Sequence, residues 1–346
     1  MTTSLDMDSA LTIDDEFLHK KGLCGLRNLG NTCFMNSIIQ CLNNTMPFIK
    51  YILTNEYKKD INEEKEEHLV VEHWNEMSRS LWHKNAVFTP VGFLKCIQKL
   101  ARSKGFGEFT GFRQNDSQEF LQFFLECAHT GLSKEVNMNI KGTPRNDYDK
   151  LAIEAYKSFT QFFKNDYSQI VKIFYGQFYT RVKKITIDNE ENSSSFEPFN
   201  SISLEIVDKS GRVTLDDCLD NFTSEETIEN GETTFIKEVK FWSLPDVLII
   251  FFKRFNNNLV KKNNLVEFPV ENLDMSKYIC GYNKSKYKYD LYAVSNHGGG
   301  LGGGHYWAYG KNKDGNWYKY NDAVVSTLKK DKVVSNNAYC LFYKKK

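Results

Sequence analysis

The sequence has no long hydrophobic run. Its longest apolar segment, Val247 to Phe252, is far shorter than the roughly 20 residues that a membrane-spanning helix needs. This segment predicts a buried strand, and we expect no insertion into a membrane. The first 21 residues also lack a cationic stretch followed by an apolar one, and they contain five acidic side chains. We therefore expect neither secretion nor mitochondrial import, and a cytoplasmic or nuclear location.

Charge of one sign is not in excess, because 45 Lys and Arg against 44 Asp and Glu leave a net charge of +1. This balance argues against binding to nucleic acid through an overall basic field. The local cluster of Lys253, Arg254, Lys261 and Lys262 is interpreted as a solvated strand end. The 8 cysteines include no CxxC pair, so we expect free thiols and no structural metal site.

The chain does contain the material for a large core. Hydrophobic residues make up 41% of it, with 26 Phe, 18 Tyr and 5 Trp, which excludes disorder as the main state. Residues 1–21 are polar and aperiodic and predict a flexible N-terminal tail. Residues 22–346 contain no internal repeat and no Pro-rich linker, so we expect one domain there.

Hydrophobic periodicity predicts helices first and strands later. Helices are expected at 33–43, at 116–129 and within 150–163. Strands are expected at 173–186, 201–206, 237–242, 247–253, 289–295, 305–310, 317–320 and 338–343. The polar stretches 188–195, 256–264 and 284–288 are interpreted as surface loops or hairpin ends. This order favours an α+β fold.

Cys33 stands at the predicted start of a helix, where Asn31 and Thr32 are expected to cap the first turn. Unpaired amides and the helix dipole favour a thiolate there, which is the nucleophilic form of cysteine. Asn28 could donate a hydrogen bond to an oxyanion beside the sulfur. The alternative is that Cys33 is a small buried hydrophobic residue and Asn28 a turn residue.

A thiol nucleophile needs a base, and His305 is the best placed of the 7 histidines. It follows the glycine-rich run 298–304 and opens a predicted strand, while His297 at the other end of the run is its competitor. The next strand ends at Asn321 and Asp322, where a hairpin would bring an amide or a carboxylate beside His305. The alternative for each of these polar residues is an ordinary turn or strand end, and the alternative for the glycine-rich run is a disordered loop. The run is not a phosphate-binding loop, because it lacks the GK[ST] motif.

Longer motifs surround these residues. The segment GLRNLGNTCFMNS at 25–37 resembles the cysteine box of the ubiquitin-specific proteases, and 304–306 through 320–322 resemble their histidine box. Further landmarks of that family occur in the same order at 114–120, 175–177, 244–248, 252–255, 266–269 and 338–343. From about residue 22 to its end, the chain is identified as a member of this family of cysteine deubiquitinases by its resemblance.

The resemblance implies a papain-like hand. Its helical thumb would span about 22–165, its short β-stranded fingers about 170–245 and its β-rich palm about 246–346. Many relatives hold zinc at the fingers with two CxxC pairs, and this sequence has neither. We therefore predict trimmed fingers that are held by strand pairing and by aromatic side chains such as Phe235, Phe241 and Trp242.

The resemblance also implies roles for the residues of the two boxes. Cys33 would be the nucleophile, and His305 would be the general base and then the acid. Asn321 would orient His305, and Asn28 would support the oxyanion. Asp322 either helps to polarise the site or orients the histidine itself, and both options stay open. No cofactor is implied.

The implied reaction is hydrolysis of the bond after the C-terminal glycine of ubiquitin. The tail of ubiquitin carries arginines and ends in two glycines, so a narrow cleft with a carboxylate further out would suit it. Asp116 is the candidate carboxylate, Tyr306 the candidate wall of the glycine channel, and Gln114 a further substrate contact from the same landmark. Asp116 can also cap its helix, since a carboxylate has about four lone-pair sites, and Tyr306 can be a packing residue.

Two alternatives to a deubiquitinase remain at this point. The same machinery could prefer another ubiquitin-like modifier whose tail ends in two glycines. The chain could also be a ubiquitin-binding scaffold without turnover, although the intact set of Cys33, His305 and Asn321 argues against that. The expected partners are ubiquitin and ubiquitinated proteins, bound by a monomer.

Overall fold

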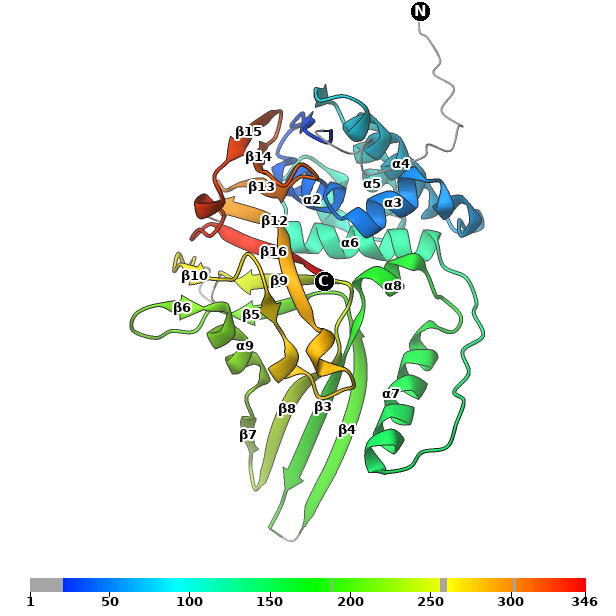
Figure 1. Cartoon of the computed structure of the whole chain (residues 1–346), viewed down its shortest axis with the longest axis vertical. Helices are drawn as coiled ribbons and strands as arrows, with labels where there is room; N and C mark the ends of the chain where they lie inside the picture. The colour runs from blue at the N-terminus through cyan, green and yellow to red at the C-terminus, as the bar shows by residue number, and fades with distance from the viewer. Residues whose placement is uncertain (1–20, 188, 256–259, 301–302) are drawn as a thin grey trace, which may run out of the picture. The chain divides into compact units, whose positions relative to one another are not determined.

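The computed structural model describes residues 21–187, 189–255, 260–300 and 303–346. Of the predicted tail, residues 1–20 lie outside the described residues. The chain forms two compact units, whose elements are drawn in Figure 1. Unit 1 runs to Ser133 and includes Tyr306–Leu328, and unit 2 comprises Lys134–His305 and Lys329–Lys346.

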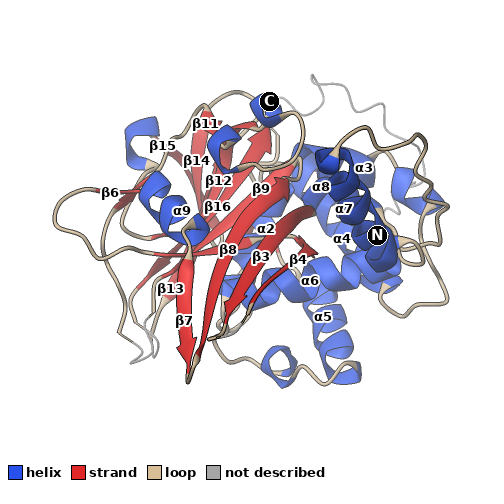
Figure 2. Ribbon diagram, turned by 90° about the horizontal axis from the view of Figure 1, so that it is seen from below, coloured by secondary structure: helices blue, strands red, loops and turns tan. Residues whose placement is uncertain are grey.

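Unit 1 is built mainly from helices, which are blue in Figure 2. The helices described in it are α2 (Cys33–Asn43), α3 (Met46–Leu53), α4 (His68–His83), α5 (Val91–Ser103) and α6 (Ser117–Gly131). The apolar faces of α2 and α4 pack against α6. A cluster of buried rings fills the space between them, and its members include Trp74 and Phe124 with ring centroids 4.9 Å apart. The helices predicted at 33–43 and 116–129 are confirmed.

The N-termini of α2 and α6 differ in how they are capped. Asp116 caps α6, because Oδ1 accepts from the amides of Gln118 at 2.6 Å and Glu119 at 3.4 Å. Within the described chain, the Thr32 side chain makes no capping hydrogen bond to α2, since its hydroxyl accepts from the amide of Leu29 at 2.9 Å. The prediction that Asn31 and Thr32 cap α2 is wrong, because the Thr32 hydroxyl holds the loop before the helix and Nδ2 of Asn31 donates to the carbonyl of Phe112 at 3.0 Å.

Short strands complete unit 1. β1 (Gly25–Leu26) pairs in parallel with β2 (Val87–Phe88). β13 (His305–Lys311), β14 (Trp317–Asn321) and β15 (Val324–Leu328) follow one another as an antiparallel meander. The strands predicted at 305–310 and 317–320 are confirmed. The boundary between the units falls inside β13, after its first residue.

The larger sheet segment of unit 2 has the strand order β12-β16-β9-β5. Its strands are β12 (Lys288–Gly298), β16 (Ala338–Lys345), β9 (Val247–Lys253) and β5 (Ile202–Glu205), and β11 (Leu273–Asp274) pairs with β12. Every residue of β9 except Lys253 is buried. Burial on both faces explains the continuous apolar run that the sequence shows there. All four strands predicted in this region are confirmed.

A second sheet in unit 2 occupies the region predicted as fingers, and Figure 2 shows its long strands. The strand order is β4 (Glu190–Phe199), β3 (Gly176–Ile185), β8 (Thr233–Ser243) and β7 (Glu226–Asn230). Strand pairing and aromatic packing hold it as predicted, with Phe241 and Trp242 buried. Its three long strands have 10, 10 and 11 residues.

Two local predictions in this sheet differ from the structure. The stretch 188–195 was interpreted as a surface loop or a hairpin end, and its residues 190–195 form the start of strand β4 in a hairpin with β3. These six residues are exposed and polar. Neither apolar alternation nor burial marks them as a strand, and their pairing with β3 alone makes them one. The strand predicted at 173–186 begins later, because residues 173 and 174 close the helix α8 (Gln169–Phe174).

The remaining elements of unit 2 surround these sheets. They include α7 (Asp147–Phe163), which confirms the third predicted helix, α9 (Leu215–Thr223), β6 (Val213–Thr214) and β10 (Val266–Glu267). α7 lies along β4 in Figure 1, where the Ser158 hydroxyl donates to the Phe196 carbonyl at 2.6 Å. The predicted loop at 284–288 contains a short 3₁₀ turn, Lys284–Lys286. Residues 256–259 of the other predicted loop lie outside the described residues.

The cationic cluster near the end of β9 was predicted to be a solvated strand end, which holds for the exposed Lys253 but is wrong for Arg254. The side chain of Arg254 is only 1% exposed. Its guanidinium donates to the carbonyls of Ala338 at 2.7 Å, Lys262 at 2.9 Å and Asn264 at 3.1 Å. Burial lowers the pKa of Arg254 to about 10. The hydrogen bonds to these three backbone carbonyls hold the side chain inside the protein, and no local sequence pattern reveals them.

Among the described helices we find none that combines the length and the apolar character needed to cross a membrane.

Candidate active site

Cys33 is the first residue of α2, and its side chain is buried. Burial raises the pKa of its thiol above the ordinary value, and the negative charge of Asp322 raises it further. Backbone amides of Tyr306, Phe34 and Cys33 itself act in the opposite direction and lower it. The net shift is upward, so the sulfur is a thiol at neutral pH in this arrangement. A nucleophilic thiolate forms there only when a neighbouring base accepts the proton.

The loop before Cys33 is held by the side chain of Asn28. Its Oδ1 accepts from the amides of Gly30 and Thr32, each at 3.1 Å. Gly30 and Asn31 both have positive φ, at 98° and 57°, which produces the tight reversal that leads into α2. Because Oδ1 faces two N–H groups, the amide orientation of Asn28 is defined and Nδ2 points the other way.

Asp322 receives that Nδ2 group. Its Oδ2 accepts from Asn28 at 3.0 Å, and its Oδ1 accepts from Nδ2 of Asn36 on α2 at 2.8 Å. The backbone carbonyl of Asp322 also accepts from the amide of Leu26 in β1 at 2.8 Å. Asp322 therefore ties the end of β14 to the loop before Cys33 and to the first turns of α2. Asn321, its half-buried neighbour, pairs with Val324 at the turn between β14 and β15.

The predicted substrate-contact residues gather at the start of α6. While Oδ1 of Asp116 caps the helix, its Oδ2 accepts from the hydroxyl of Tyr306 at 3.3 Å. Burial, and then the charge of Asp116, raises the pKa of Tyr306 well above its usual value, so its hydroxyl stays protonated. Gln114 lies exposed two residues before Asp116. Capping by Asp116 thus coexists with a second interaction, as the sequence allowed.

One acidic residue here was missed as a site candidate. Partial burial, together with the charges of Asp116 and Glu108, raises the pKa of Glu119. Three carboxylates therefore share one region of unit 1 and concentrate negative potential there. Two carboxylates three residues apart at a helix start were the available signal, because that spacing places them on one face.

His305 opens β13 and directly precedes Tyr306, whose backbone amide lowers the pKa of Cys33. Its ring is half-buried. Its competitor His297 is buried, and its pKa is lowered to about 4 by burial and by the charges of Lys261, Arg254 and His305. A histidine with so low a proton affinity is a weak base at neutral pH. The structure therefore favours His305 over His297 as the base.

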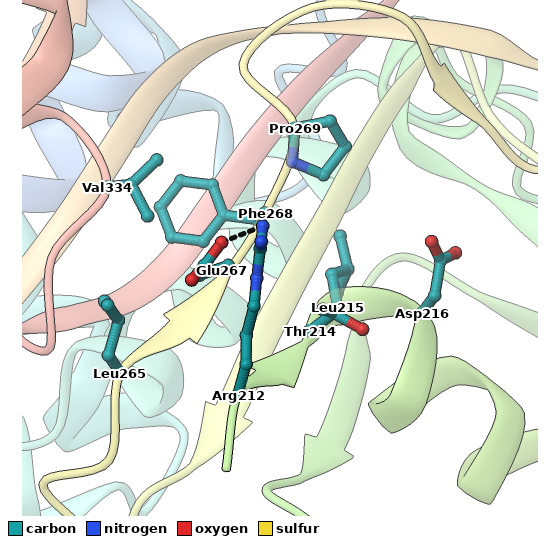
Figure 3. A pocket seen from close by; sticks show the side chains of 9 residues that line it. All are labelled: Arg212, Thr214, Leu215, Asp216, Leu265, Glu267, Phe268, Pro269 and Val334. Atoms are coloured by element: carbon teal, nitrogen blue, oxygen red, sulfur yellow. Dashed lines mark ion pairs between the residues drawn. The ribbon is translucent and has the colours of Figure 1, made fainter.

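Other features of the described chain lie outside this constellation. A cavity of about 530 Å³ in unit 2, shown in Figure 3, is crossed by an ion pair between Arg212 and Glu267. It is lined by Arg212, Thr214, Leu215, Asp216, Leu265, Glu267, Phe268, Pro269 and Val334. All 8 cysteines are free thiols. Among the residues that the structure describes, no three His, Cys, Asp or Glu side chains are grouped to hold a metal ion.

Comparisons with known proteins assign the chain to a family. The model of the ubiquitin carboxyl-terminal hydrolase family matches residues 24–343. Human ubiquitin carboxyl-terminal hydrolase 2 is 33% identical over 342 residues, which cover 93% of this chain and 55% of that protein. Human ubiquitin carboxyl-terminal hydrolase 21 is 29% identical over 372 residues, covering 95% of this chain and 64% of that protein.

Solved structures give the same result. The SAGA Ubp8/Sgf11/Sus1/Sgf73 DUB module bound to ubiquitin aldehyde aligns with a TM-score of 0.68 and 25% identity, over 95% of this chain and 70% of that one. The chain belongs to the ubiquitin carboxyl-terminal hydrolase family. The predicted family and the α+β fold are confirmed. The chain spans little more than half the length of human ubiquitin carboxyl-terminal hydrolase 2.

Proposed function

We propose that this chain is a thiol-dependent deubiquitinase that hydrolyses the peptide or isopeptide bond after the C-terminal glycine of ubiquitin. Membership of the family supports the reaction class. The observation that carries the proposal is the arrangement at the start of α2. There, the buried Cys33 begins a helix, and the loop before it contains Asn28. The side-chain amide of Asn28 is oriented by the carboxylate of Asp322 and by the backbone amide of Gly30.

The attack begins with a proton transfer. Cys33 is held as a thiol, because burial and Asp322 raise its pKa. His305 takes the proton as the general base and later gives it to the leaving lysine amine. The sulfur forms a thioester with the carbonyl carbon of the terminal glycine, and the bond to the amine breaks. Water then attacks the thioester and releases ubiquitin with a free carboxylate.

Asn28 stabilises the oxyanion that forms during both steps. Its Nδ2 has two hydrogens, and Asp322 accepts one of them. The second hydrogen is the one we assign to the oxyanion. Because its Oδ1 is held by two amides, the donor is oriented before the substrate arrives. Preorganised donors of this kind lower the barrier more than donors that must reorient during the reaction.

The acidic group on and beside α6 supports a cationic substrate tail. The carboxylates of Asp116, Glu119 and Glu108 make the local potential negative; partial burial, and then the charges of Asp116 and Glu108, raise the pKa of Glu119. Arginines of the ubiquitin tail would relieve the repulsion among these charges. Ubiquitin conjugates are therefore the proposed partners, and ubiquitin aldehyde is bound in a solved structure of the Ubp8 module. We further propose a monomeric catalytic domain over residues 22–346 that acts in the cytoplasm or nucleus.

A trapping experiment tests this function. Purified protein is mixed with ubiquitin that carries a thiol-reactive electrophile at its C-terminus, and the adduct is detected by mass spectrometry. We expect one adduct, on Cys33, which Cys33→Ala abolishes and the matched control Cys280→Ala retains. A second probe, built on another ubiquitin-like modifier with a two-glycine tail, runs in parallel. Labelling by that probe alone would move the substrate class, and labelling by neither would contradict the proposed catalysis.

A further inference from the structure

Lys261, a lysine of unit 2, forms hydrogen bonds at the start of the glycine-rich run 298–304, which precedes His305. Nζ of Lys261 donates to the carbonyl of His297 at 2.7 Å and to the carbonyl of Gly299 at 3.1 Å. These carbonyls lie on either side of Gly298, the last residue of β12. One ammonium therefore binds the chain at two points, directly where β12 ends and the run begins.

Lys261 is itself held in place by the two residues that follow β9. A β-bridge joins Lys261 to Phe255, and the amide of Lys262 donates to the carbonyl of Arg254 at 2.6 Å. The guanidinium of Arg254 donates hydrogen bonds to the carbonyls of Lys262 and Asn264. The backbone of Lys261 and of Lys262 is thus bound to the segment that follows β9, and the ammonium of Lys261 extends from this hydrogen-bonded backbone.

The cations of Arg254 and Lys261 bind backbone carbonyls. In the part of the chain that the structure describes, no carboxylate forms an ion pair with either of them. Burial and the charge of Arg254 lower the pKa of Lys261. Two cations kept together without a counter-ion cost free energy. Such an arrangement points to a role beyond surface solvation.

The contact continues from Lys261 to the residue before His305. The ring of His297 lies so close to the backbone of Gly304 that a Cβ on Gly304 would stand 2.1 Å from Nε2 of His297. The ring of His297 also neighbours those of Phe255 and Tyr339, with centroids 5.9 Å and 6.3 Å away. Its backbone amide donates to the carbonyl of Asn337 at 2.8 Å. His297 is therefore held by several contacts, and its ring packs against the backbone of Gly304 at the end of the glycine-rich run.

We propose that Lys261 is a positioning residue for His305, which acts by holding the backbone at His297 and Gly299 so that the His297 ring supports Gly304. The role rests on the proposed deubiquitinase function. Glycine residues have no side chains to hold a defined path, and ordering them costs conformational entropy. Two charge-assisted hydrogen bonds from outside the run supply that order at its start.

The test compares three variants of neighbouring lysines. Lys261→Met keeps the length of the side chain and removes its donors, whereas Lys261→Arg keeps a cation with several donors. Lys262→Met is the matched control, because Nζ of Lys262 binds the Ile206 carbonyl and Asp208 instead of the run. Each variant is assayed for cleavage of a fluorogenic ubiquitin C-terminal amide, and its melting temperature is measured.

We expect Lys261→Met to lower kcat about tenfold or more, because small displacements of a catalytic group have large effects on rate. KM should stay within about twofold, since no substrate contact is removed. Lys261→Arg should recover most of the rate, and Lys262→Met should match the wild type. A role in stability alone would instead lower the melting temperature and leave kcat of the folded protein unchanged, which would overturn the proposal.

A second readout does not depend on turnover. Histidine ring signals are followed by NMR across pH, with His305→Ala and His297→Ala used for assignment. We expect the His305 signals to move in Lys261→Met and to stay in place in Lys262→Met. If the wild type fails to cleave ubiquitin, the proposed function is wrong, and these signals still decide the positioning role. Unmoved His305 signals in Lys261→Met, with wild-type kcat wherever the wild type turns over, would reject it.

Discussion

Nδ2 of Asn28 donates a hydrogen bond to Oδ2 of Asp322 at 3.0 Å, across 294 positions of sequence. The other carboxylate oxygen accepts from Asn36, so both oxygens of Asp322 serve the segment around Cys33. A carboxylate used in this way orients Asn28, the proposed oxyanion donor, and keeps a negative charge near the sulfur. The two effects act in opposite directions on catalysis. Orienting Asn28 favours the reaction, whereas the charge of Asp322 raises the pKa of Cys33 and so disfavours the thiolate.

The first prediction separates these effects. Asp322→Asn should lower kcat about tenfold or more, since an amide can accept on one side only and loses one of the bonds to Asn28 and Asn36. The same substitution should lower the pKa of Cys33, because a charge that raises it is removed. The pH dependence of Cys33 alkylation, followed by mass spectrometry of its peptide, measures this. A raised pKa in the variant would contradict our account of the charge.

The second prediction concerns the oxyanion donor. Asn28→Ala should lower kcat by about 10²–10³-fold, the usual cost of losing one such donor. KM should change little, because the donor acts on charge that develops in the transition state. Steady-state kinetics on a ubiquitin amide measure both constants. Asn139→Ala, which removes an exposed loop asparagine in unit 2, is the matched control and should behave as the wild type.

The third prediction concerns the acidic group at α6. Partial burial, Asp116 and Glu108 raise the pKa of Glu119, so this carboxylate gains its proton earlier than usual as pH falls. Its attraction for a cationic tail is present above that pKa and is lost below it. We therefore expect KM for ubiquitin to rise as pH falls through this range. Glu119→Gln should raise KM and flatten its pH dependence, whereas Glu126→Gln, two turns further along α6, should do neither.

The fourth prediction concerns the core of unit 1. The ring of Phe124 is buried and lies 4.9 Å from that of Trp74, with further ring contacts to Phe48 and Phe93. Phe124→Ala should destabilise the protein by about 3–5 kcal/mol, through lost burial and the cavity left behind. Denaturant unfolding measures the free energy. Phe162→Ala, at a side chain that is 53% exposed, should have a much smaller effect.

The fifth prediction concerns metal. The sequence has no cysteine from residue 177 to 217, nor from 219 to 279, so the long strands of the finger sheet lack the thiolates of a structural zinc site. Excess chelator should leave the melting temperature unchanged. Phe241→Ala should lower it, because the buried ring of Phe241 packs against Phe178 and Phe222. A fall in melting temperature with chelator alone would reveal a metal that we do not expect.

The sequence by itself determined the family and much of the α+β fold. The cysteine and histidine boxes identified Cys33, Asn28, His305 and Asn321 as candidates, because short motifs encode them without reference to the rest of the chain. Periodicity placed α2 and β9 at their observed bounds. These elements bury a continuous face or a whole strand, and burial of that kind leaves a pattern in local sequence.

Only the tertiary structure decided which partners those residues have. β4 is a strand because β3 pairs with it, and Arg254 is buried because three carbonyls from other segments bind its guanidinium. The bonds from Asp322 to Asn28 and from Lys261 to the carbonyls of His297 and Gly299 likewise join distant parts of the chain. Hydrogen bonds and burial depend on which groups lie close together in the folded chain, and neither composition nor local spacing shows which groups those are.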